Sequence, residues 1–211
     1  MSLSVETITG AEIAGIIPAL ARLRIAVFRE WPYLYAGDDP VYEEAYLAPY
    51  VGSSGTAIIV ARHESQIVGA STCLPLKDEV AEIRAPFAQR GLDLERFFYF
   101  GESVVLPQWR GHGLGKRFFA ERERQARHMK AEFAVFCAVR RPEDHPARPA
   151  SFRPLHKFWA DRGFTPLPAV SCSLDWRDVG ATEESPHQLD FWIRPLQDTA
   201  IPDALLTGIP A

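Results

Sequence analysis

Cysteine is scarce in this chain. Its 211 residues include only three cysteines, Cys73, Cys137 and Cys172, and these lie far apart in the sequence. The sequence therefore has neither the dense, even-numbered cysteines of a disulfide-stabilised secreted domain nor the close spacing of a zinc site. An odd, sparse set is typical of a reducing cytosol. We therefore expect a cytoplasmic protein that binds no metal.

An excess of positive charge is also missing. The formal net charge is −4, whereas a general nucleic-acid-binding or membrane-surface protein would need a basic excess. The first residues, MSLSVETITG, lack the basic segment of a signal peptide, and no apolar run reaches the length of a membrane span. These absences predict a soluble protein with neither a nucleic-acid nor a membrane partner.

The residues that are present predict one mixed α/β domain. An apolar fraction of 47% with 24% charged residues is ordinary for a globular protein, and this length suits a single core. The hydrophobic periodicity predicts the element order βααβββαβαββ. We expect a domain over 1–195, followed by a tail over 196–211 without a clear pattern. Strands are expected at 5–8, 56–61, 67–74, 97–106, 133–139, 169–174 and 189–193, and helices at 11–30 (with a break or kink near Pro18), 41–50, 114–130 and 155–162.

A glycine-rich turn, VVLPQWRGHGLGKRF, joins a predicted strand to a predicted helix. Gly111, Gly113 and Gly115 let backbone amides approach an anion without interference from a Cβ atom. The first amides of the following helix have no partner within it, and the helix dipole adds partial positive charge there. Arg110 and Lys116 flank the glycines. The turn therefore predicts a phosphate site, although such turns also serve close packing alone.

Two common phosphate motifs do not fit this turn. A P-loop would require glycine where Arg110 stands and serine or threonine where Arg117 stands. A dinucleotide-binding fingerprint would require a third glycine at Lys116 and a parallel βαβ opening, whereas the strands upstream are predicted to form a meander.

A third phosphate motif matches better. The segment 110–115, RGHGLG, resembles the R/Q-x-x-G-x-G/A signature of the GNAT superfamily of N-acetyltransferases, which binds the pyrophosphate of acetyl-coenzyme A (acetyl-CoA). The segment 104–107, VVLP, resembles that family's fourth strand, and 158–164, FWADRGF, resembles its late helix and following strand. The resemblance covers roughly 5–193. It implies a central mixed, largely antiparallel sheet, flanked by helices and splayed between its fourth and fifth strands.

The resemblance also implies a reaction and a cofactor site. An amine attacks the thioester of acetyl-CoA directly in a ternary complex, and the backbone amide of Val105 stabilises the oxyanion. Dimers are frequent in the family, so a homodimer is one expected assembly. The residues expected to bind the cofactor are Val104, Val105 and Leu106 on the strand, Arg110, Gly111, His112, Gly113, Leu114, Gly115 and Lys116 in the turn, and Trp159 on the late helix.

The acid–base residues are less well defined. Glu102 is the candidate base by position, although a strand glutamate of this kind can instead pair with an arginine. Trp159 stands where the family often has a tyrosine that protonates the departing thiolate, and indole is not an acid near neutral pH. Trp159 is then expected to pack against the thiol arm or within the core. Either His156 takes the tyrosine's role or coenzyme A leaves unaided.

The acceptor site is expected in the segment WPYLYAGDD, between the first two helices. Trp31, Tyr33, Tyr35 and Asp38 offer aromatic faces and a carboxylate, which suit a cationic amine. The alternative is that the aromatic residues only pack and the acidic ones cap the next helix. The sequence therefore predicts an N-acetyltransferase acting on a small-molecule amine. The rival interpretations are a non-catalytic acyl-CoA-binding module and a nucleotide-dependent enzyme.

Overall fold

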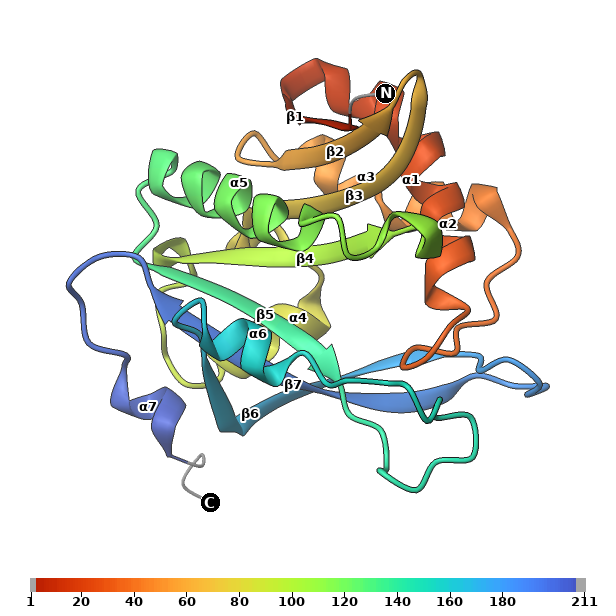
Figure 1. Cartoon of the computed structure of the whole chain (residues 1–211). Coiled ribbons are helices and arrows are strands. Elements are labelled where there is room, and N and C mark those ends of the chain that lie inside the picture. The colour runs from red at the N-terminus through yellow and green to blue at the C-terminus, as the bar shows by residue number, and fades with distance from the viewer. Residues whose placement is uncertain (1–2, 208–211) are drawn as a thin grey trace.

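A single seven-stranded sheet forms the centre of the protein. The computed structural model describes residues 3–207, and within them the strand order is β1-β2-β3-β4-β5-β7-β6 (Figure 1). Neighbouring strands are antiparallel except for β4 and β5, which are parallel. The prediction of a mixed, largely antiparallel sheet is therefore confirmed. The strands are β1 Leu3–Thr9, β2 Ala57–His63, β3 Gln66–Pro75, β4 Phe97–Val105, β5 Phe133–Val139, β6 Thr165–Trp176 and β7 Ser185–Pro195.

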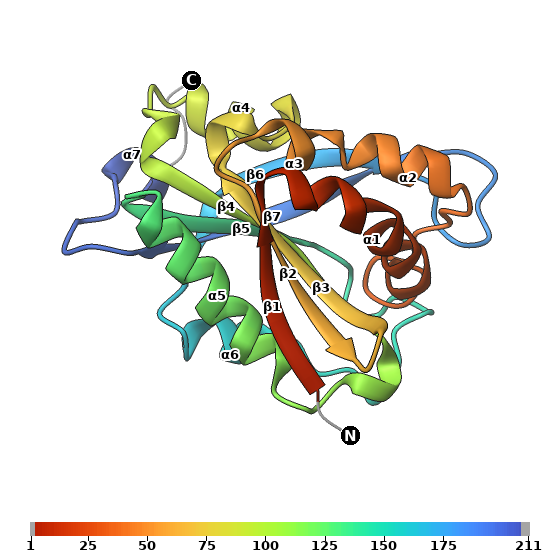
Figure 2. The ribbon, with the colours of Figure 1, turned by 90° about the horizontal axis from the view of Figure 1, so that it is seen from above.

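Helices cover both faces of the sheet (Figure 2). The alternation along β4 shows how they do so, because Phe97 and Tyr99 pack into the core beneath α1, while Phe98 and Phe100 pack into the core beneath α5. One face carries α1 Ile13–Phe28, α2 Pro40–Tyr46, α3 Ala48–Gly52 and α4 Ala81–Ala88, and the other carries α5 Leu114–His128 and α6 His156–Ala160.

The two parallel strands separate along their length. β4 and β5 are paired only from Phe97↔Phe133 to Tyr99↔Val135, and beyond this point they diverge (Figure 1). Six residues of β4 therefore lie past the last paired residue on that side. The predicted splay between the fourth and fifth strands is confirmed.

A β-bulge in β4 lies at the start of this separation. Ser71 is opposite Ser103 and Cys73 is opposite Phe100, so Gly101 and Glu102 together face only Thr72. Thr72 Oγ1 accepts a hydrogen bond from the Glu102 amide at 2.9 Å, and the Ser71 hydroxyl donates to the Glu102 carbonyl at 2.8 Å. Side chains of β3 thus form the hydrogen bonds that the backbone of Glu102 would otherwise form with the backbone of β3.

Only glycine fits at the first position of the bulge. A Cβ atom on Gly101 would lie 2.5 Å from Thr72 Oγ1 and 2.5 Å from the Tyr50 hydroxyl oxygen. The bulge, β3 and α3 are therefore packed together at this point.

Several element boundaries differ from the sequence predictions. α1 continues through Pro18 without a break, and the predicted helix over 41–50 is two short helices, with Pro49 in the first turn of the second. β6 begins at Thr165, earlier than the predicted 169, and includes Pro166 and Pro168. Proline is tolerated there because β6 is an edge strand.

The chain after Pro195 contains a short helix, α7 Asp203–Leu206. Leu205 is buried, and Arg90 Nε donates to the Ala204 carbonyl at 3.0 Å. Arg90 Nη2 also donates to the Ala169 carbonyl of β6 at 2.5 Å. These bonds hold the tail against α4 and β6. Residues 208–211 of the predicted tail lie outside the described residues. Within 3–207, no helix is long and apolar enough to cross a membrane.

Candidate active site

A large cleft occupies the space between the diverging strands. Its volume is about 1650 Å³. The elements that line it are β4, β5, α1, the segment 31–35, the first turn of α5, the loop that precedes α6, and parts of β6 and β7. The glycine turn and the aromatic segment after α1, which are far apart in the sequence, therefore share one cavity.

The open edge of β4 supplies backbone groups to this cleft. The Leu106 amide donates to the Val68 carbonyl at 3.0 Å. Because residues opposite one another in antiparallel strands alternate between bonded and non-bonded pairs, Ser103 and Val105 direct their backbone groups away from β3, toward the gap. Arg110 Nε donates to the Val105 carbonyl at 3.2 Å. The Ser103 and Val105 amides remain at the cleft edge. Ser103 was not singled out from the sequence.

The other two strand residues of the predicted cofactor site differ from Val105. Val104 is fully buried in the core, and Leu106 is half-buried with its amide used by Val68. Neither side chain lines the cleft, although Val105 does.

The glycine turn leads directly into α5. Gly111 and Gly113 have φ values of +80° and +78°, a region that favours glycine, and Gly113 is the residue before the helix. The amides of Lys116 and Arg117 both donate to the Gly113 carbonyl. The amides just before them have no partner within the helix, and they lie at the positive end of its dipole beside the cleft.

The predicted side chains of the turn have different surroundings. Arg110 forms an exposed ion pair with Glu30 at 2.8 Å, whereas Lys116 is exposed and lines the cleft. His112 is exposed and its ring lies over the turn, with Nδ1 3.0 Å from the Arg110 carbonyl oxygen. It is not among the cleft-lining residues. Leu114 and Gly115 both line the cleft.

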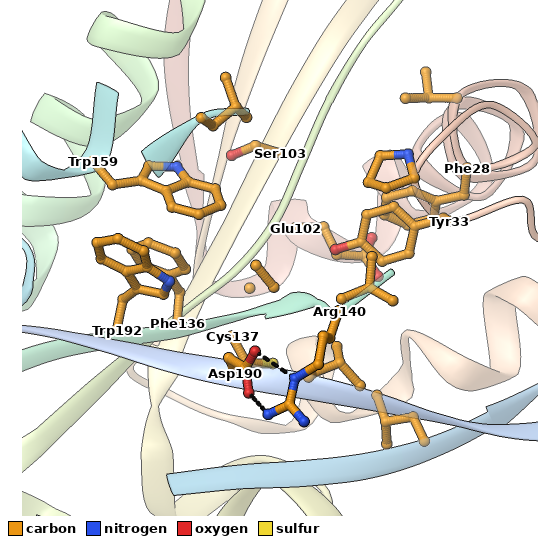
Figure 3. Close-up of a pocket in the computed structure, with 18 of the residues that line it drawn as sticks. Phe28, Tyr33, Glu102, Ser103, Phe136, Cys137, Arg140, Trp159, Asp190 and Trp192 are labelled. Carbon is orange, nitrogen blue, oxygen red and sulfur yellow. Dashed lines mark hydrogen bonds and ion pairs between the residues drawn. The ribbon is translucent and has the colours of Figure 1, made fainter. Parts of the chain in front are cut away.

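An aromatic wall faces the open edge of β4. The Trp159 ring lies 5.0 Å from Phe136 and 5.1 Å from Trp192, measured between ring centroids. Figure 3 shows this group across the cleft from Ser103. The exposed ring of His156 lies 5.6 Å from Trp159 and 5.5 Å from Trp192. The sequence placed His156 and Trp159 on one helix, but it gave no sign that Phe136 and Trp192 would join them.

Glu102 is held by an arginine. Arg24 on α1 is 6% exposed, and its Nη1 forms an ion pair with Glu102 Oε1 while its Nε donates to Glu43 Oε2 at 2.5 Å. The Tyr35 hydroxyl donates to the other oxygen of Glu43 at 2.5 Å. Burial and this hydrogen bond raise the pKa of Tyr35 well above its ordinary value. Glu102 is therefore a strand glutamate paired with an arginine, which was the alternative to its being the catalytic base.

The aromatic residues after α1 line the cleft, as expected for an acceptor site, and they also pack. Tyr33 contacts Phe28 at 4.5 Å between centroids, and Trp31 contacts His145 at 5.1 Å. Tyr35 is bonded to Glu43, as described above. Asp38 is exposed and is absent from the cleft lining; its carboxylate lies 3.8 Å from Arg177. The next residue, Asp39, caps α2 by accepting from the Val41 amide at 2.9 Å.

Two adjacent arginines at the end of β5 were missed by the sequence analysis. Arg141 donates to the Tyr33 carbonyl at 2.5 Å and pairs with Asp178 at 2.7 Å, which lowers the pKa of Asp178. Arg140 pairs with Asp190 on β7 (Figure 3). The Arg141 contacts attach the start of the proline-rich loop over 140–154 to the segment after α1, and the Arg140 contact attaches it to β7. The arginine pair begins that loop, but its partners are distant in the sequence, so no local pattern indicated them.

The insertion between β3 and β4, residues 76–96, forms a further wall of the cleft. Its cleft-lining residues are Glu79, Val80, Glu82 and Ile83. Within residues 3–207, no three His, Cys, Asp or Glu side chains are grouped in a way that could hold a metal ion.

Comparison with known proteins identifies the family. The sequence matches the family model described as "Acetyltransferase (GNAT) family" over residues 22–164, more than half of the chain. The chain belongs to the GNAT family of acetyltransferases. It is therefore an acyltransferase, and the family predicted from the glycine turn is confirmed. No curated protein is similar enough to the chain to count as a match.

Solved GNAT structures share its fold. A ribosomal-protein-alanine N-acetyltransferase from Brucella melitensis is 17% identical, with a TM-score of 0.57 over 91% of this chain and 99% of that one. A polyamine N-acetyltransferase from Drosophila melanogaster is 14% identical, with a TM-score of 0.56 over 92% and 100%. An N-acetyltransferase from Thermoplasma acidophilum, solved with coenzyme A, is 10% identical, with a TM-score of 0.50 over 92% and 99%. At these identities the similarity establishes the fold alone.

Proposed function

We propose that this GNAT protein transfers the acetyl group of acetyl-CoA to a primary amine of a small molecule, by direct attack within a ternary complex. The observation that carries the proposal is the open edge of β4. The amides of Ser103 and Val105 face the gap, and they lie in the same cleft as the N-terminus of the helix after Gly113.

The cofactor half of the site follows from this edge. The amides of the glycine turn and of the first turn of α5 would bind the pyrophosphate, with Lys116 adding a full charge. The backbone of β4 past the bulge would pair with the pantetheine arm like an added strand. The amide of Val105, or that of Ser103 beside it, would donate to the acetyl oxygen as negative charge develops there. Trp159 and Phe136 would form the apolar wall around the thioester.

The acceptor half favours a cation. Glu43 and Glu102 share one cation, Arg24, and a third carboxylate, Glu79, lies close enough to Arg24 to feel its charge. With Arg84 also near Glu79, three carboxylates face two cations in this part of the molecule, and a protonated amine would restore the balance. The aromatic faces of Tyr33 and Trp31 suit the same group. The similar Drosophila protein is described as forming N-acetylagmatine, so agmatine is a suitable first probe.

The experiment is an acceptor panel. Protein and acetyl-CoA are mixed with agmatine, spermidine, an aminoglycoside, amino acids and a peptide with a free N-terminus, and the release of free thiol is followed. Turnover with a small amine, and none with the peptide, supports the proposal. Tight binding of acetyl-CoA without turnover on a broad panel supports the acyl-CoA-binding module instead. Binding of NADH or ATP in place of acetyl-CoA, measured by calorimetry, supports the nucleotide-dependent enzyme.

A further inference from the structure

Glu79 is a buried carboxylate on the wall of the cleft. It begins the insertion between β3 and β4, and only 8% of its surface is exposed. Its Oε1 accepts a hydrogen bond from the Tyr50 hydroxyl at 3.1 Å, and its Oε2 accepts one from the Val80 amide at 2.7 Å. Two donors fix the carboxylate, and each of its oxygens retains a further lone pair.

Glu79 differs from Glu43 and Glu102, the carboxylates bound to Arg24, in having no cationic partner of its own. Within residues 3–207, no Lys, Arg or His nitrogen lies within 4.0 Å of the Glu79 carboxylate. Arg84, on the same insertion, donates instead to the Lys77 carbonyl at 3.2 Å. A buried carboxylate without a cation is costly, and a ligand that brings a cation would offset that cost.

The position of Glu79 connects it to the β4 bulge. The Tyr50 hydroxyl that holds Glu79 also lies against Gly101, 2.5 Å from the place a Cβ atom would occupy. Gly101 precedes Ser103 by two residues, and the Ser103 amide faces the gap. Glu79 therefore lies at the acceptor end of the same strand edge that would hold the acetyl group.

We propose that Glu79 receives the ammonium group of the acceptor and acts as the general base that takes its proton. This inference rests on the proposed function. One N–H bond of the ammonium breaks, and the proton moves to a Glu79 oxygen. The free amine nitrogen then forms a bond with the thioester carbon. The C–S bond breaks as the tetrahedral intermediate collapses, and coenzyme A leaves as a thiolate. The proton still carried in excess by the new amide nitrogen passes to the thiolate, and Glu79 releases its own proton to water.

The surroundings of Glu79 suit this role. Burial raises the pKa of Glu79, while the hydrogen bonds from Val80 and Tyr50 and the charges of Arg24 and Arg84 lower it less strongly. The other titratable groups near Glu79 are Tyr46, Tyr50, Tyr99 and Cys137. Burial raises the pKa of all three tyrosines, and burial and the neighbouring Cys172 raise that of the Cys137 thiol, so all four stay neutral where Glu79 ionises. A raised pKa makes this carboxylate a stronger base than an ordinary glutamate.

The test compares Glu79→Gln with the wild type, using the best acceptor from the panel. Glutamine keeps the shape and accepts the bond from Tyr50, but it cannot take a proton. We expect kcat/KM to fall by about 10²-fold or more and the acidic limb of its pH profile to disappear, with an unchanged dissociation constant for acetyl-CoA. Glu79→Asp should recover part of the rate. Glu95→Gln, an exposed carboxylate of the same insertion paired with Lys77, is the matched control and should behave as wild type.

A second variant keeps the base and changes its environment. Tyr50→Phe removes a hydrogen bond that lowers the pKa of Glu79, so the acidic limb should move to higher pH. A purely structural role for Glu79 would reduce activity without moving this limb. The same profiles for Glu102→Gln test the sequence prediction for that residue.

The outcomes separate the two proposals. If the wild type acetylates an amine and Glu79→Gln keeps the wild-type rate and acidic limb, the role of Glu79 is overturned and the proposed function stands. If Glu102→Gln alone removes the limb, Glu102 is the base. If the wild type acetylates no amine on the panel, the proposed function fails, and the role of Glu79 fails with it.

Discussion

Arg24 on α1 forms an ion pair with Glu102 at the β4 bulge, on the strand edge that opens into the cleft. The same guanidinium bonds to Glu43 on α2. One buried side chain therefore joins α1 and α2, the helices on either side of the aromatic segment 31–35, to the strand that would carry the cofactor.

Loss of this guanidinium should destabilise the fold. Arg24→Met leaves two carboxylates without their cation, the buried Glu43 and the largely buried Glu102. Breaking a buried pair from one side typically costs about 3–5 kcal/mol. The free energy of unfolding, measured in urea, should fall by that amount. Arg22→Met, at an exposed position of the same helix, should change it little. A loss of similar size in both variants would show that the cost comes from replacing an arginine anywhere on α1 and not from the ion pairs of Arg24.

The glycine turn offers a test of cofactor binding, because alanine at Gly113 can be compared with alanine at Gly10, where the backbone is similarly strained. Gly113 has φ +78° and Gly10, at the far end of β1, has φ +61°, and a Cβ atom would meet nothing within 4 Å at either position. Alanine at either position should lower the free energy of unfolding by about 1–2 kcal/mol, because both positions lie in the left-handed region. Only Gly113→Ala should weaken acetyl-CoA binding, by tenfold or more, in calorimetry. Equal affinities in the two variants would remove the turn from the cofactor site.

Arg122 on α5 is a buried cation that lacks a carboxylate partner among the described residues. Burial lowers its pKa to about 10, while the rings of Phe100 and Phe119 lie 4.7 and 4.4 Å from its guanidinium carbon. At pH values below that pKa the guanidinium is charged, and its burial lowers the free energy of unfolding. Arg122→Met should therefore raise the free energy of unfolding at neutral pH by about 1–2 kcal/mol. Arg117→Met, exposed on the same helix, is the control, and a destabilised Arg122→Met would assign the guanidinium a favourable role.

Glu79 should also make stability depend on pH. Its pKa is raised in the folded protein, so the folded state holds a proton that the unfolded state has already lost. Stability is then greatest below the unfolded pKa and falls as pH rises through the folded pKa. Glu79→Gln should raise the melting temperature at neutral pH, and this gain should vanish in acid. A gain of the same size at every pH would arise from packing.

The sequence predicted the fold well because the relevant signals are local. The glycine turn and the apolar run before it lie within fifteen residues, and hydrophobic periodicity defined all seven strands. The edge strand β6 was predicted too short, since Pro166 and Pro168 contradict the local pattern and only its position at the sheet edge permits them.

Side-chain partners in the cleft could not be predicted in the same way. Glu102 was identified by its place on the strand, but its partner Arg24 lies far away in the sequence, on a different element. Glu79 stands in a polar insertion where a carboxylate is ordinarily solvated, whereas in the fold it is buried and bonded to Tyr50 of a distant helix. Burial and charge pairing of this kind arise from the tertiary fold.

The bulged edge strand β6 has a consequence for solubility. An exposed edge invites another chain to extend the sheet, which is a common route to aggregation. In β6, Pro166 and Pro168 remove two amide donors, and a register shift between Leu167 and Ser171 interrupts the ladder. Arg90 covers the Ala169 carbonyl and binds the tail through Ala204. A protein shortened after Pro195 would lose α7, which packs against β6, and we expect it to aggregate more readily while its cleft stays intact.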